Sequence, residues 1–425
     1  MTPEVKKRIE QIHQGIVPDG YTKTRSGITP TTWTPACLGN IYTERREPGN
    51  ESLPLLTVSI HSGVSDGELD EDELPKKVKR IEDKSQYKRA ATGDLVFNMM
   101  RAWQGAIGTV RTEGMVSPAY IVAKPNGKVY PPFMDYYMKA PRMVGMINRQ
   151  SYGVTDFRKR LYWDSFAPIP CVLPPVREQK KIAEILSTQD KAIELQARKI
   201  EELKRFKKGC LEKMFPRKGQ KVPEKRFPGF TDDWEQRKLT EFVEFFSGLT
   251  YTPNDVQENG TLVLRSSNVS NGEVVDADNV YVNPQVVNSE NVKVGDIVVV
   301  VRNGSRSLIG KHAQIKAFMP NTVIGAFMTG IRSECPKFTN ALLNTSRFEE
   351  EIAMNMGATI NQITGYMFSK MEFKVPCLDE QKEIGEYFEN LDHLITLHQR
   401  KLEEMKKQKK ALMQLLLTGI VRVQS

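Results

Sequence analysis

Two long stretches of the chain alternate apolar and polar positions in steps of four and three residues, which is the spacing of a heptad. They run from Glu178 to Lys208 and from Glu380 to Lys410. The apolar seam positions are Ile182, Leu186, Ile193, Ile200 and Leu203 in the first stretch, and Ile384, Phe388, Leu391, Ile395, Leu402 and Met405 in the second. Each pattern predicts a helix of about forty residues, about 55 Å long at about 1.5 Å per residue.

The second stretch repeats the first at an offset of 202 residues, the separation of Glu178 from Glu380. A heptad seam needs a partner helix, and the simplest partner is the other copy. We therefore expect an antiparallel coiled-coil pair. The alternative is that each helix packs only on its own domain, but a helix this long exceeds what one small domain can cover. Polar residues at matching depths, Gln196 with His398 and Lys207 with Lys409, would weaken the seam and fix its register.

The repeat extends back into the segments that precede each helix. Matching landmarks are Trp33 with Trp234, Gly93-Asp94 with Gly295-Asp296, Gly108 with Gly310, and Ala119-Tyr120 with Ala326-Phe327. The chain is therefore two copies of one unit, a variable globular domain followed by a long helix. The predicted fold class is α+β, with two pseudo-symmetric α/β domains separated by the helix pair.

The predicted boundaries follow from the repeat and from proline- and glycine-bearing linkers. They are a short helical segment at 1–19, a globular domain at 20–172, a spacer helix at 173–216, a linker at 217–232, a second globular domain at 233–376 and a second spacer helix at 377–425. In each domain three apolar runs predict strands, at 53–60, 94–100 and 119–124 and at 261–267, 296–302 and 326–332. Helical patterns at 133–147 and 341–356 follow them.

Two loops occupy the same place in the repeat but differ in sequence, "RAWQGAIG" at 101–108 and "RNGSRSLIGK" at 302–311. Arginine, asparagine and glutamine can form paired hydrogen bonds with base edges, so such loops could read different DNA sequences. The candidate DNA-binding residues are Arg101, Gln104, Arg111, Arg265, Asn268, Arg302, Asn303, Arg306 and Lys311. The simpler alternative is a pair of solvated turns, in which glycine and asparagine are ordinary.

Composition narrows the class of protein. A formal net charge of +9 and a pI near 9.1 suit a polyanionic partner such as nucleic acid, although many basic proteins have none. Five scattered cysteines without a CxxC pair, and no HExxH sequence, favour neither a disulfide framework nor a metal site. The chain has no apolar stretch of about 20 residues and no secretion signal, so we expect a cytoplasmic protein without a membrane partner.

Sequences that would indicate catalysis do not fit. "YPPF" at 130–133 resembles a base-amine methyltransferase motif, but a tyrosine stands where the amino group should be bound. "GSRSLIGKH" at 304–312 resembles a phosphate-binding loop, but its glycine spacing is wrong and no serine or threonine follows Lys311. We expect no catalytic residues in this chain.

The two "EQK" helices, each trailing a domain with the tryptophan–leucine and "GD" landmarks, resemble the DNA-specificity subunit of type I restriction–modification systems. The resemblance covers nearly the whole chain. It implies that each globular domain is a target-recognition domain for one half of a bipartite DNA site, and that the helices are spacers. Because the loops differ between the domains, the two half-sites are expected to differ.

The same resemblance implies the partners. They are double-stranded DNA, methyltransferase subunits, expected to number two, and restriction subunits, up to two. It places S-adenosylmethionine, ATP and magnesium on those subunits, so this chain is expected to hold no cofactor. Two other classes remain open: a free-standing bipartite DNA-binding regulator, which would bind its site tightly alone, and a coiled-coil scaffold, which would ignore DNA sequence.

Overall fold

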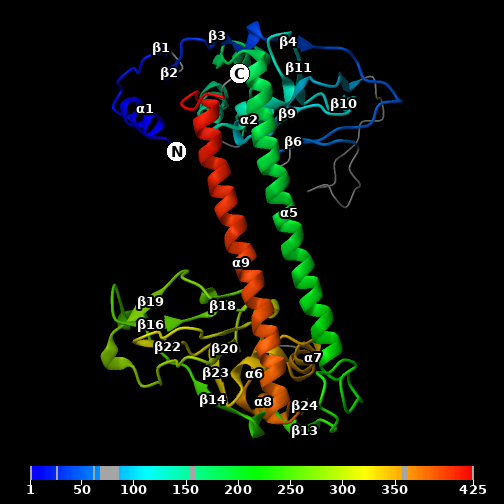
Figure 1. Ribbon diagram of the computed structural model, residues 1–425, viewed down its shortest axis with the longest axis vertical. Helices are drawn as coiled ribbons and strands as arrows, with labels where there is room; N and C mark the ends of the chain where they lie inside the picture. Colours follow the sequence, from blue (N-terminus) through cyan, green and yellow to red (C-terminus); the bar gives the residue numbers. More distant parts are fainter. Residues whose placement is uncertain are drawn as a thin grey trace. The chain divides into compact units, whose positions relative to one another are not determined.

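The computed structural model describes residues 2–24, 27–60, 63–67, 86–153, 158–356 and 361–423. The chain divides into two compact units. Unit 1 comprises Met1–Leu195 and Leu402–Ser425, and unit 2 comprises Gln196–Lys401. Both long helices cross the division, so each unit contains one end of each helix (Figure 1). Helices combine with mostly antiparallel sheets in both units, which confirms the expected α+β class.

In both units a run of strands is followed by three short helices, one strand and a long helix. Unit 1 has the helices α1 (Pro3–His13), α2 (Pro131–Lys139), α3 (Pro141–Gln150), α4 (Trp163–Phe166) and the start of α5 (Val176–Met214), and the strands β1 (Tyr21–Thr24), β2 (Gly27–Pro30), β3 (Thr34–Cys37), β4 (Tyr42–Arg45), β5 (Val58–Ser59), β6 (Gly63–Val64), β7 (Lys88–Ala90), β8 (Leu95–Asn98), β9 (Ile107–Thr109), β10 (Gly114–Val116), β11 (Tyr120–Pro125) and β12 (Pro170–Leu173).

Unit 2 has the helices α6 (Pro336–Leu343), α7 (Ser346–Asn355), α8 (Gly365–Lys370) and the start of α9 (Leu378–Leu417), and the strands β13 (Glu235–Lys238), β14 (Val243–Ser247), β15 (Val256–Gln257), β16 (Thr261–Leu264), β17 (Val269–Ser270), β18 (Glu273–Val274), β19 (Val280–Val282), β20 (Ile297–Val300), β21 (His312–Gln314), β22 (Thr322–Ile324), β23 (Met328–Ser333) and β24 (Glu372–Val375).

Each unit is built on a four-stranded antiparallel sheet with the same strand order, β4-β11-β8-β9 in unit 1 and β14-β23-β20-β21 in unit 2. The register corrects one predicted match, because Phe97 pairs with Ile107 whereas Val299 pairs with His312. The connection in unit 2 is thus three residues longer, and Gly310 corresponds to Gly105 rather than to Gly108. Both glycines have positive φ, 103° and 83°, a conformation that favours glycine.

The register also corrects the match of Ala119-Tyr120 with Ala326-Phe327. Tyr120 pairs with Asn98, and Met328 pairs with Val300, the residue equivalent to Asn98. Tyr120 therefore corresponds to Met328, and Ala119 to Phe327. The match by residue letters is therefore wrong by one position, because the sequence does not show where the extra residues of unit 2 are inserted.

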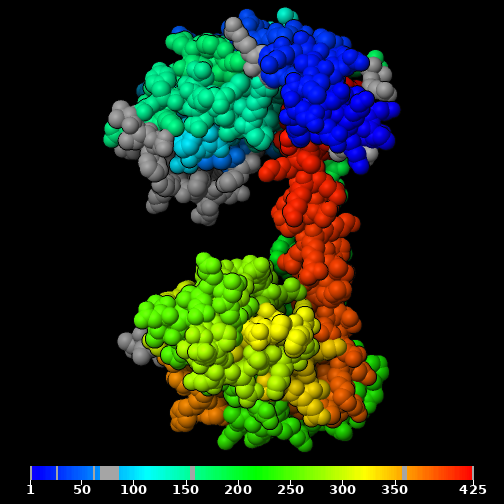
Figure 2. Space-filling view, turned by 90° about the vertical axis from the view of Figure 1, so that its left-hand side faces the viewer, coloured from blue at the N-terminus to red at the C-terminus, as the bar shows by residue number. Residues whose placement is uncertain are grey.

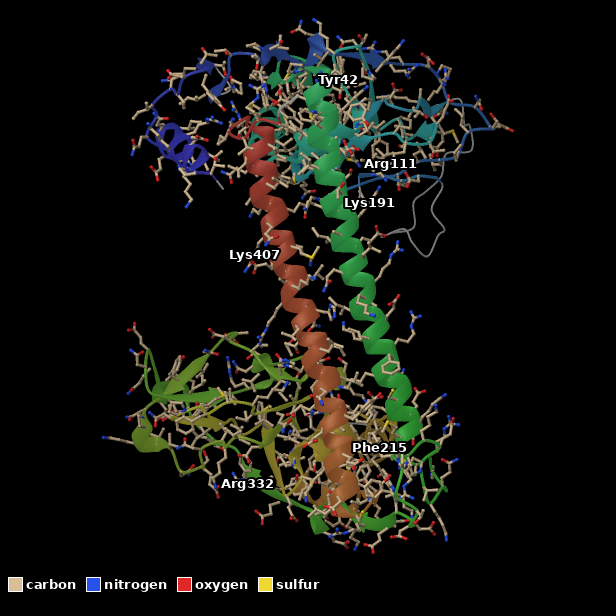
Figure 3. All side chains as sticks on the ribbon, viewed as in Figure 1. Tyr42, Arg111, Lys191, Phe215, Arg332 and Lys407 are labelled. Atoms are coloured by element: carbon tan, nitrogen blue, oxygen red, sulfur yellow. The ribbon has the colours of Figure 1, made fainter. Side chains whose placement is uncertain are left out.

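The core of each unit joins the sheet to the ends of the two long helices. In unit 1, Phe97, Phe133 and Phe166 are packed with Ile182 and Leu186 of α5. In unit 2, Phe215 at the end of α5, labelled in Figure 3, stacks on Phe338 at 5.6 Å and lies 6.1 Å from Phe388 of α9. Burying apolar side chains of this size is the main favourable term in folding.

Beside the shared sheet the units differ. Unit 2 has a second four-stranded sheet, β15-β19-β16-β22, in which β16 and β22 run parallel. At the comparable place unit 1 has the two-stranded sheets β5-β6 and β7-β10 within its described residues.

The seam positions lie between α5 and α9, and the polar ones are paired. Within unit 2 the Nε2 of Gln196 donates to the carbonyl of His398 and lies 2.8 Å from its Nδ1, while Lys207 donates to Asp392 at 2.6 Å. Cys210 lies 3.4 Å from the hydroxyl of Tyr387, so the two helices run antiparallel.

In unit 1 the corresponding contact joins Lys409 of α9 to Asp190 of α5. The pairs are reciprocal, because Lys207 and Lys409, and Asp190 and Asp392, are each separated by the repeat offset. The predicted antiparallel helix pair is confirmed, and the polar seam positions have specific partners. Among the described helices, none combines the length and apolar character needed to cross a membrane.

The repeated "EQ" at the start of each long helix has a structural cause. Glu380 is fully buried and receives two hydrogen bonds, at 2.7 and 2.8 Å, from Arg226 in the segment that follows α5. Glu178 receives two at the same distances from Arg422, which follows α9. The next residues, Gln179 and Gln381, each donate to the carbonyl of the proline five residues earlier. Each helix start is thereby held by the segment trailing the other helix.

The N-terminal segment completes this arrangement in unit 1. Arg8 of α1 donates to the carbonyl of Ile420 at 3.0 Å, and the hydroxyl of Tyr21 donates to the carbonyl of Gly419 at 2.8 Å. Figure 2 shows the blue N-terminal segment against the red end of α9. The predicted short N-terminal helix, α1, therefore packs where the chain ends.

Candidate nucleic-acid interface

One end of the unit 2 sheet carries three loops that backbone hydrogen bonds join. Val301 donates to the carbonyl of Phe327 at 3.0 Å and accepts from the amide of Ile363 at 2.8 Å. Arg302 forms an isolated β-bridge with Gln362, and the side chain of Asn361 donates to the carbonyl of Gly304 at 3.1 Å. The loop predicted to contact DNA, 302–311, is thus held by a fixed backbone frame.

Unit 1 has the same frame with other side chains. Met99, the equivalent of Val301, donates to the carbonyl of Ala119 at 3.1 Å and accepts from the amide of Leu161 at 2.9 Å. The loop at 101–108 therefore leaves the sheet at the same point as its counterpart. A shared frame with different loop sequences is the arrangement expected of two readers with different targets.

Three cationic candidates in unit 2 are exposed on this frame: Arg302, Arg306 and Lys311. None of them has an ion pair to an acidic residue in the described part of the chain. The guanidinium of Arg302 lies 5.0 Å from the ring centre of Phe327, and that ring is 56% exposed. A cation stacked on an exposed ring presents both a charge and a flat apolar face, and both suit contact with nucleic acid.

In unit 1, Arg101 and Gln104 are exposed at the corresponding loop. Neither side chain forms a hydrogen bond with another described residue, so both are available to a ligand. Aromatic residues stand near them. The Nζ of Lys159 lies 5.6 Å from the ring centre of Trp103, and Tyr152, which is 60% exposed, lies 5.4 Å from the ring centre of Tyr162.

The side chains of two further candidates form hydrogen bonds within unit 2. Asn268 is buried; its Oδ1 accepts from the amide of Arg265 and its Nδ2 donates to the carbonyl of Ala277. With its amide group used inside the protein, Asn268 is not placed to reach a base. Arg265 lies at the same turn, and its guanidinium is held by Asp278 at 2.6 Å.

Asn303 links two loops. Its Nδ2 donates to the hydroxyl of Ser266 at 3.0 Å, and its Oδ1 accepts from the amide of Ser305 at 2.9 Å. These bonds place the Arg265 turn beside the loop at 302–311. Asn303 therefore shapes the surface that the neighbouring arginines present.

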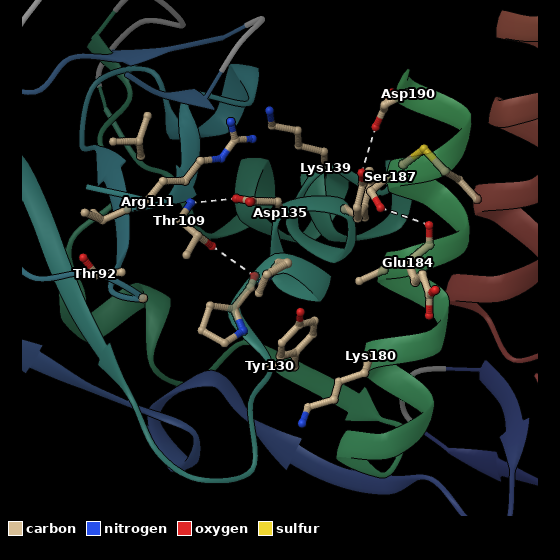
Figure 4. A pocket seen from close by; sticks show the side chains of 18 of the residues that line it. Thr92, Thr109, Arg111, Tyr130, Asp135, Lys139, Lys180, Glu184, Ser187 and Asp190 are labelled. Atoms are coloured by element: carbon tan, nitrogen blue, oxygen red, sulfur yellow. Dashed lines mark hydrogen bonds between the residues drawn. The ribbon is translucent and has the colours of Figure 1, made fainter. Parts of the chain in front are cut away.

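Arg111 lies apart from the other unit 1 candidates. It follows β9 by two residues, whereas Arg101 and Gln104 precede that strand, so they are at opposite ends of it. Its side chain lines a cleft instead (Figure 4). The sequence could not separate these positions, because only the strand pairing shows where the loop ends.

The exposed aromatic residues of the interface were not anticipated. Phe327, Tyr152 and Tyr366 are each more than half exposed, which is unusual for rings of this size. The Nζ of Lys370 lies 4.3 Å from the ring centre of Tyr366. The sequence feature that could have indicated these residues is an aromatic residue next to a glycine-containing turn. That feature is too common in proteins to identify a site.

Comparison with known proteins gives a consistent result. The family described as "Type I restriction modification DNA specificity domain" matches residues 104–205 and 231–407, which is more than half of the chain. The type I restriction enzyme MjaVIII specificity subunit of Methanocaldococcus jannaschii is 28% identical over 74% of this chain and 76% of its own. A putative MjaX specificity subunit of the same organism is 26% identical over 96% and 98%.

Two solved structures share the fold at low sequence identity. One chain, from work described as the structural basis of complex assembly and conformational transition of the type I R-M system, is 16% identical and has a TM-score of 0.57, covering 92% of this chain and 99% of its own. The S subunit of a type I restriction-modification system from M. genitalium is 13% identical and has a TM-score of 0.55, covering 92% and 97%.

Proposed function

The chain belongs to the type I restriction–modification DNA specificity family, and from that premise we propose that it selects the DNA site of such a complex. Each unit reads one half of a bipartite site through the loops at the end of its sheet. The observation that carries the proposal is the shared backbone frame with unlike exposed side chains, Arg101 and the neutral Gln104 in one copy and Arg302, Arg306 and Lys311 in the other. Because the two backbone frames are alike and the two loops differ, the two halves of the DNA site are expected to differ.

Two kinds of contact follow from the geometry. The exposed arginines and Gln104 would form paired hydrogen bonds with base edges. Phe327 and Tyr152 offer flat surfaces for a base or a sugar. Asn303 and Arg265 fix the shape of the loops without contacting DNA. The positive net charge supplies the attraction to the phosphate backbone that does not depend on sequence.

The helix pair sets the spacing and docks the partner subunits. Its outer surface carries apolar residues at equivalent positions of the repeat, Leu195 at 63% and Leu397 at 46% exposed. Lys191 and Lys407, labelled in Figure 3, are exposed on the same helices. Exposed leucines surrounded by charges are typical of a surface that a partner covers. Adding one heptad, about 10 Å, to both helices would lengthen the gap between half-sites by about three base pairs.

The chain acts without catalysis of its own. Methyl transfer, with S-adenosylmethionine, and ATP-driven restriction belong to partner subunits, with two methyltransferase subunits and up to two restriction subunits for each copy of this chain. Support for these partners comes from the relatives, which are specificity subunits, and from a structural neighbour described within type I complex assembly. The protein works in the cytoplasm, where chromosomal DNA is accessible.

The test is a gel shift at fixed salt concentration with the chain assembled with its methyltransferase subunits. Arg302→Ala should weaken binding to the methylated site by ten- to a hundredfold, because one base contact contributes about 1–3 kcal/mol. Binding to random DNA should change little. Lys293→Ala, an exposed lysine of the same unit, is the control. Equal losses on specific and random DNA would contradict base reading, and tight specific binding by the chain alone would favour a free-standing regulator.

A further inference from the structure

Unit 1 contains a cleft of about 910 Å³ between the far end of β9, helix α2 and the ends of the two long helices (Figure 4). This volume lies within the range of small-molecule sites. The cleft is lined by residues on both sides, among them Arg111 and Thr109 from the sheet and Lys139 from α2. It lies at the opposite end of β9 from Arg101 and Gln104, so it is separate from the base-reading loops.

Two of the three acidic residues that line the cleft have hydrogen-bond partners, while the third, Glu184, forms no ion pair among the described residues. Asp190 is bound by Lys409 and by the hydroxyl of Tyr136 at 2.8 Å. Asp135 accepts from the amide of Thr109 at 2.6 Å, and burial raises the pKa of its carboxyl. Asp190 is thus neutralised by Lys409. The carboxylate of Asp135 forms no ion pair among the described residues, and it acts on Lys139 and Arg111 only through its charge at a distance.

Of the four cations that line the cleft, Lys409 is paired with Asp190, and Lys180 lies 5.8 Å from the ring centre of Tyr130. The other two are Lys139 and Arg111. Lys139 is half-buried, and its amine has no hydrogen-bond acceptor or ion pair within the described residues; burial lowers its pKa. Arg111 has one weak ion pair, to Asp66 at 3.6 Å, in which both side chains are 66% exposed. Figure 4 shows the two side chains entering the same space from the strand and from the helix. Asp135 and Asp190 act on the charge of Lys139 without bonding to its amine, so an anion from outside that bonds directly to the half-buried ammonium would be stabilised here.

In unit 2 the corresponding cation is paired with an acidic residue of the protein itself. Lys316 follows β21 as Arg111 follows β9, and it donates to Glu273 at 3.0 Å. Glu273 also accepts from the hydroxyl of Thr396 on α9 at 3.0 Å, so the acid bridges the cleft. The remaining cavity is about 180 Å³. The pairing of β5 with β6 places Gly63 at the position of Glu273, so the acid that binds Lys316 has no equivalent in unit 1. The acid nearest to Arg111 among the described residues is the exposed Asp66.

We propose that the unit 1 cleft binds a small phosphorylated molecule of about nucleotide size, with a phosphoryl group held between Arg111 and Lys139. A guanidinium and an ammonium that converge from two elements suit the several oxygens of a phosphoryl group. The amine of Lys139 would lie 3.3 Å from a Cβ added at Gly63, so a side chain at that position would crowd the amine. The proposal is independent of the DNA-reading role, which uses other loops.

Isothermal titration of the full chain with inorganic phosphate, AMP and ATP tests the site, in buffer without divalent ions. At least one of these should bind saturably with one site per chain. Arg111→Gln and Lys139→Gln should each weaken binding about tenfold, because each removes one charge-assisted hydrogen bond. Lys316→Gln, at the equivalent position of unit 2, should bind as the unaltered chain does.

Lys139→Arg keeps the charge and should retain binding, which separates loss of a ligand contact from misfolding; unfolding in urea checks each variant. No saturable binding of the three probes would overturn the proposal, as would unchanged binding in the Arg111→Gln/Lys139→Gln double variant. It would also be overturned if only random duplex DNA bound, with a shallower salt dependence in the double variant, because Arg111 and Lys139 would then contact the DNA backbone. Failure here would leave the methylated DNA sequence unchanged, so it is distinguishable from failure of the DNA-reading role.

Discussion

The two units place the same buried carboxylate at the same point of the sheet but pair it with arginines from different strands. In unit 1, Asp94 is bound by Arg45 of β4 at 2.7 Å. In unit 2, Asp296 is bound twice, at 2.8 and 2.9 Å, by Arg332 of β23. The position equivalent to Arg45 is occupied by Phe246, and the guanidinium of Arg332 lies 4.9 Å from its ring centre.

This difference shows what the repeat preserves. Both units keep an ion pair with the buried carboxylate, although the arginine comes from a different strand in each. The pair is kept because a buried carboxylate without a partner would destabilise the sheet. The loop frame is kept in the same sense, as interactions rather than as residues, whereas the helix starts keep both, because glutamate and glutamine recur there with an arginine partner. The surfaces that face a ligand, the loops and the cleft, are where the copies diverge.

The largest expected effect concerns the helix starts. Glu380→Ala should destabilise unit 2 by about 3–5 kcal/mol, because it leaves the charge of Arg226 mostly buried and unpaired. Glu178→Ala should cost less, because the side chain of Arg422 is 32% exposed and can be solvated. Urea unfolding with hydrogen exchange of peptides from each unit measures both. Asp379→Ala, beside Glu380 and 83% exposed, is the control; a cost equal to that of Glu380→Ala would contradict the account.

The different strand positions of the arginine that binds the buried carboxylate give a second test. Arg332→Lys should cost about 1–3 kcal/mol, because lysine cannot donate two parallel hydrogen bonds to Asp296. Adding Phe246→Arg to that variant recreates the unit 1 arrangement and should recover much of the loss. Arg332→Lys with Phe246→Leu is the matched control and should recover nothing. Urea unfolding midpoints of the three variants decide the question, and equal midpoints for the two double variants would disprove the equivalence of the sites.

A smaller effect comes from His312, whose equivalent in unit 1 is the buried Ile107. Burial lowers the pKa of the His312 imidazole, Lys207 lowers it further, and Gly310 and Asp392 oppose this. Below about pH 6.5 the unfolded histidine binds a proton that the folded one does not, so the stability of unit 2 should fall as the pH falls. Above that pH the group contributes no slope.

Trp234 is the only tryptophan of unit 2, so a chain in which the other three are phenylalanine reports the unfolding of that unit. His312→Ile should flatten the loss of stability between pH 7.5 and pH 5, values chosen to span the titration of a histidine at about 6.5. A slope that persists unchanged in His312→Ile would assign the pH dependence to other groups.

Much of the fold follows from the sequence because its pattern is long and periodic. The seam residues, from Ile182 to Met405, predicted the antiparallel pair, and the offset between Glu178 and Glu380 predicted the duplication. The strands at 94–100 and 296–302 contain β8 and β20. These predictions succeeded because helical and strand periodicity are local properties of the chain.

The site was predicted only in part, for a physical reason. Arg101 and Arg302 are exposed on the loops as expected, but Asn268 is buried and Arg111 lines a cleft. Which residue reaches a surface depends on strand register and on contacts between loops distant in sequence, such as that of Asn303 with Ser266. Those contacts leave no periodic trace, and the residue types are equally suited to turns and to DNA.

The most direct measurement of the central claim is an exchange of one recognition domain. Residues 20–172 are replaced by the corresponding domain of another family member, the chain is assembled with its methyltransferase subunits, and methylated bases are mapped across a genome. The account predicts that one half of the bipartite site changes while the other half and the gap stay the same. A change in both halves, or in neither, would contradict it.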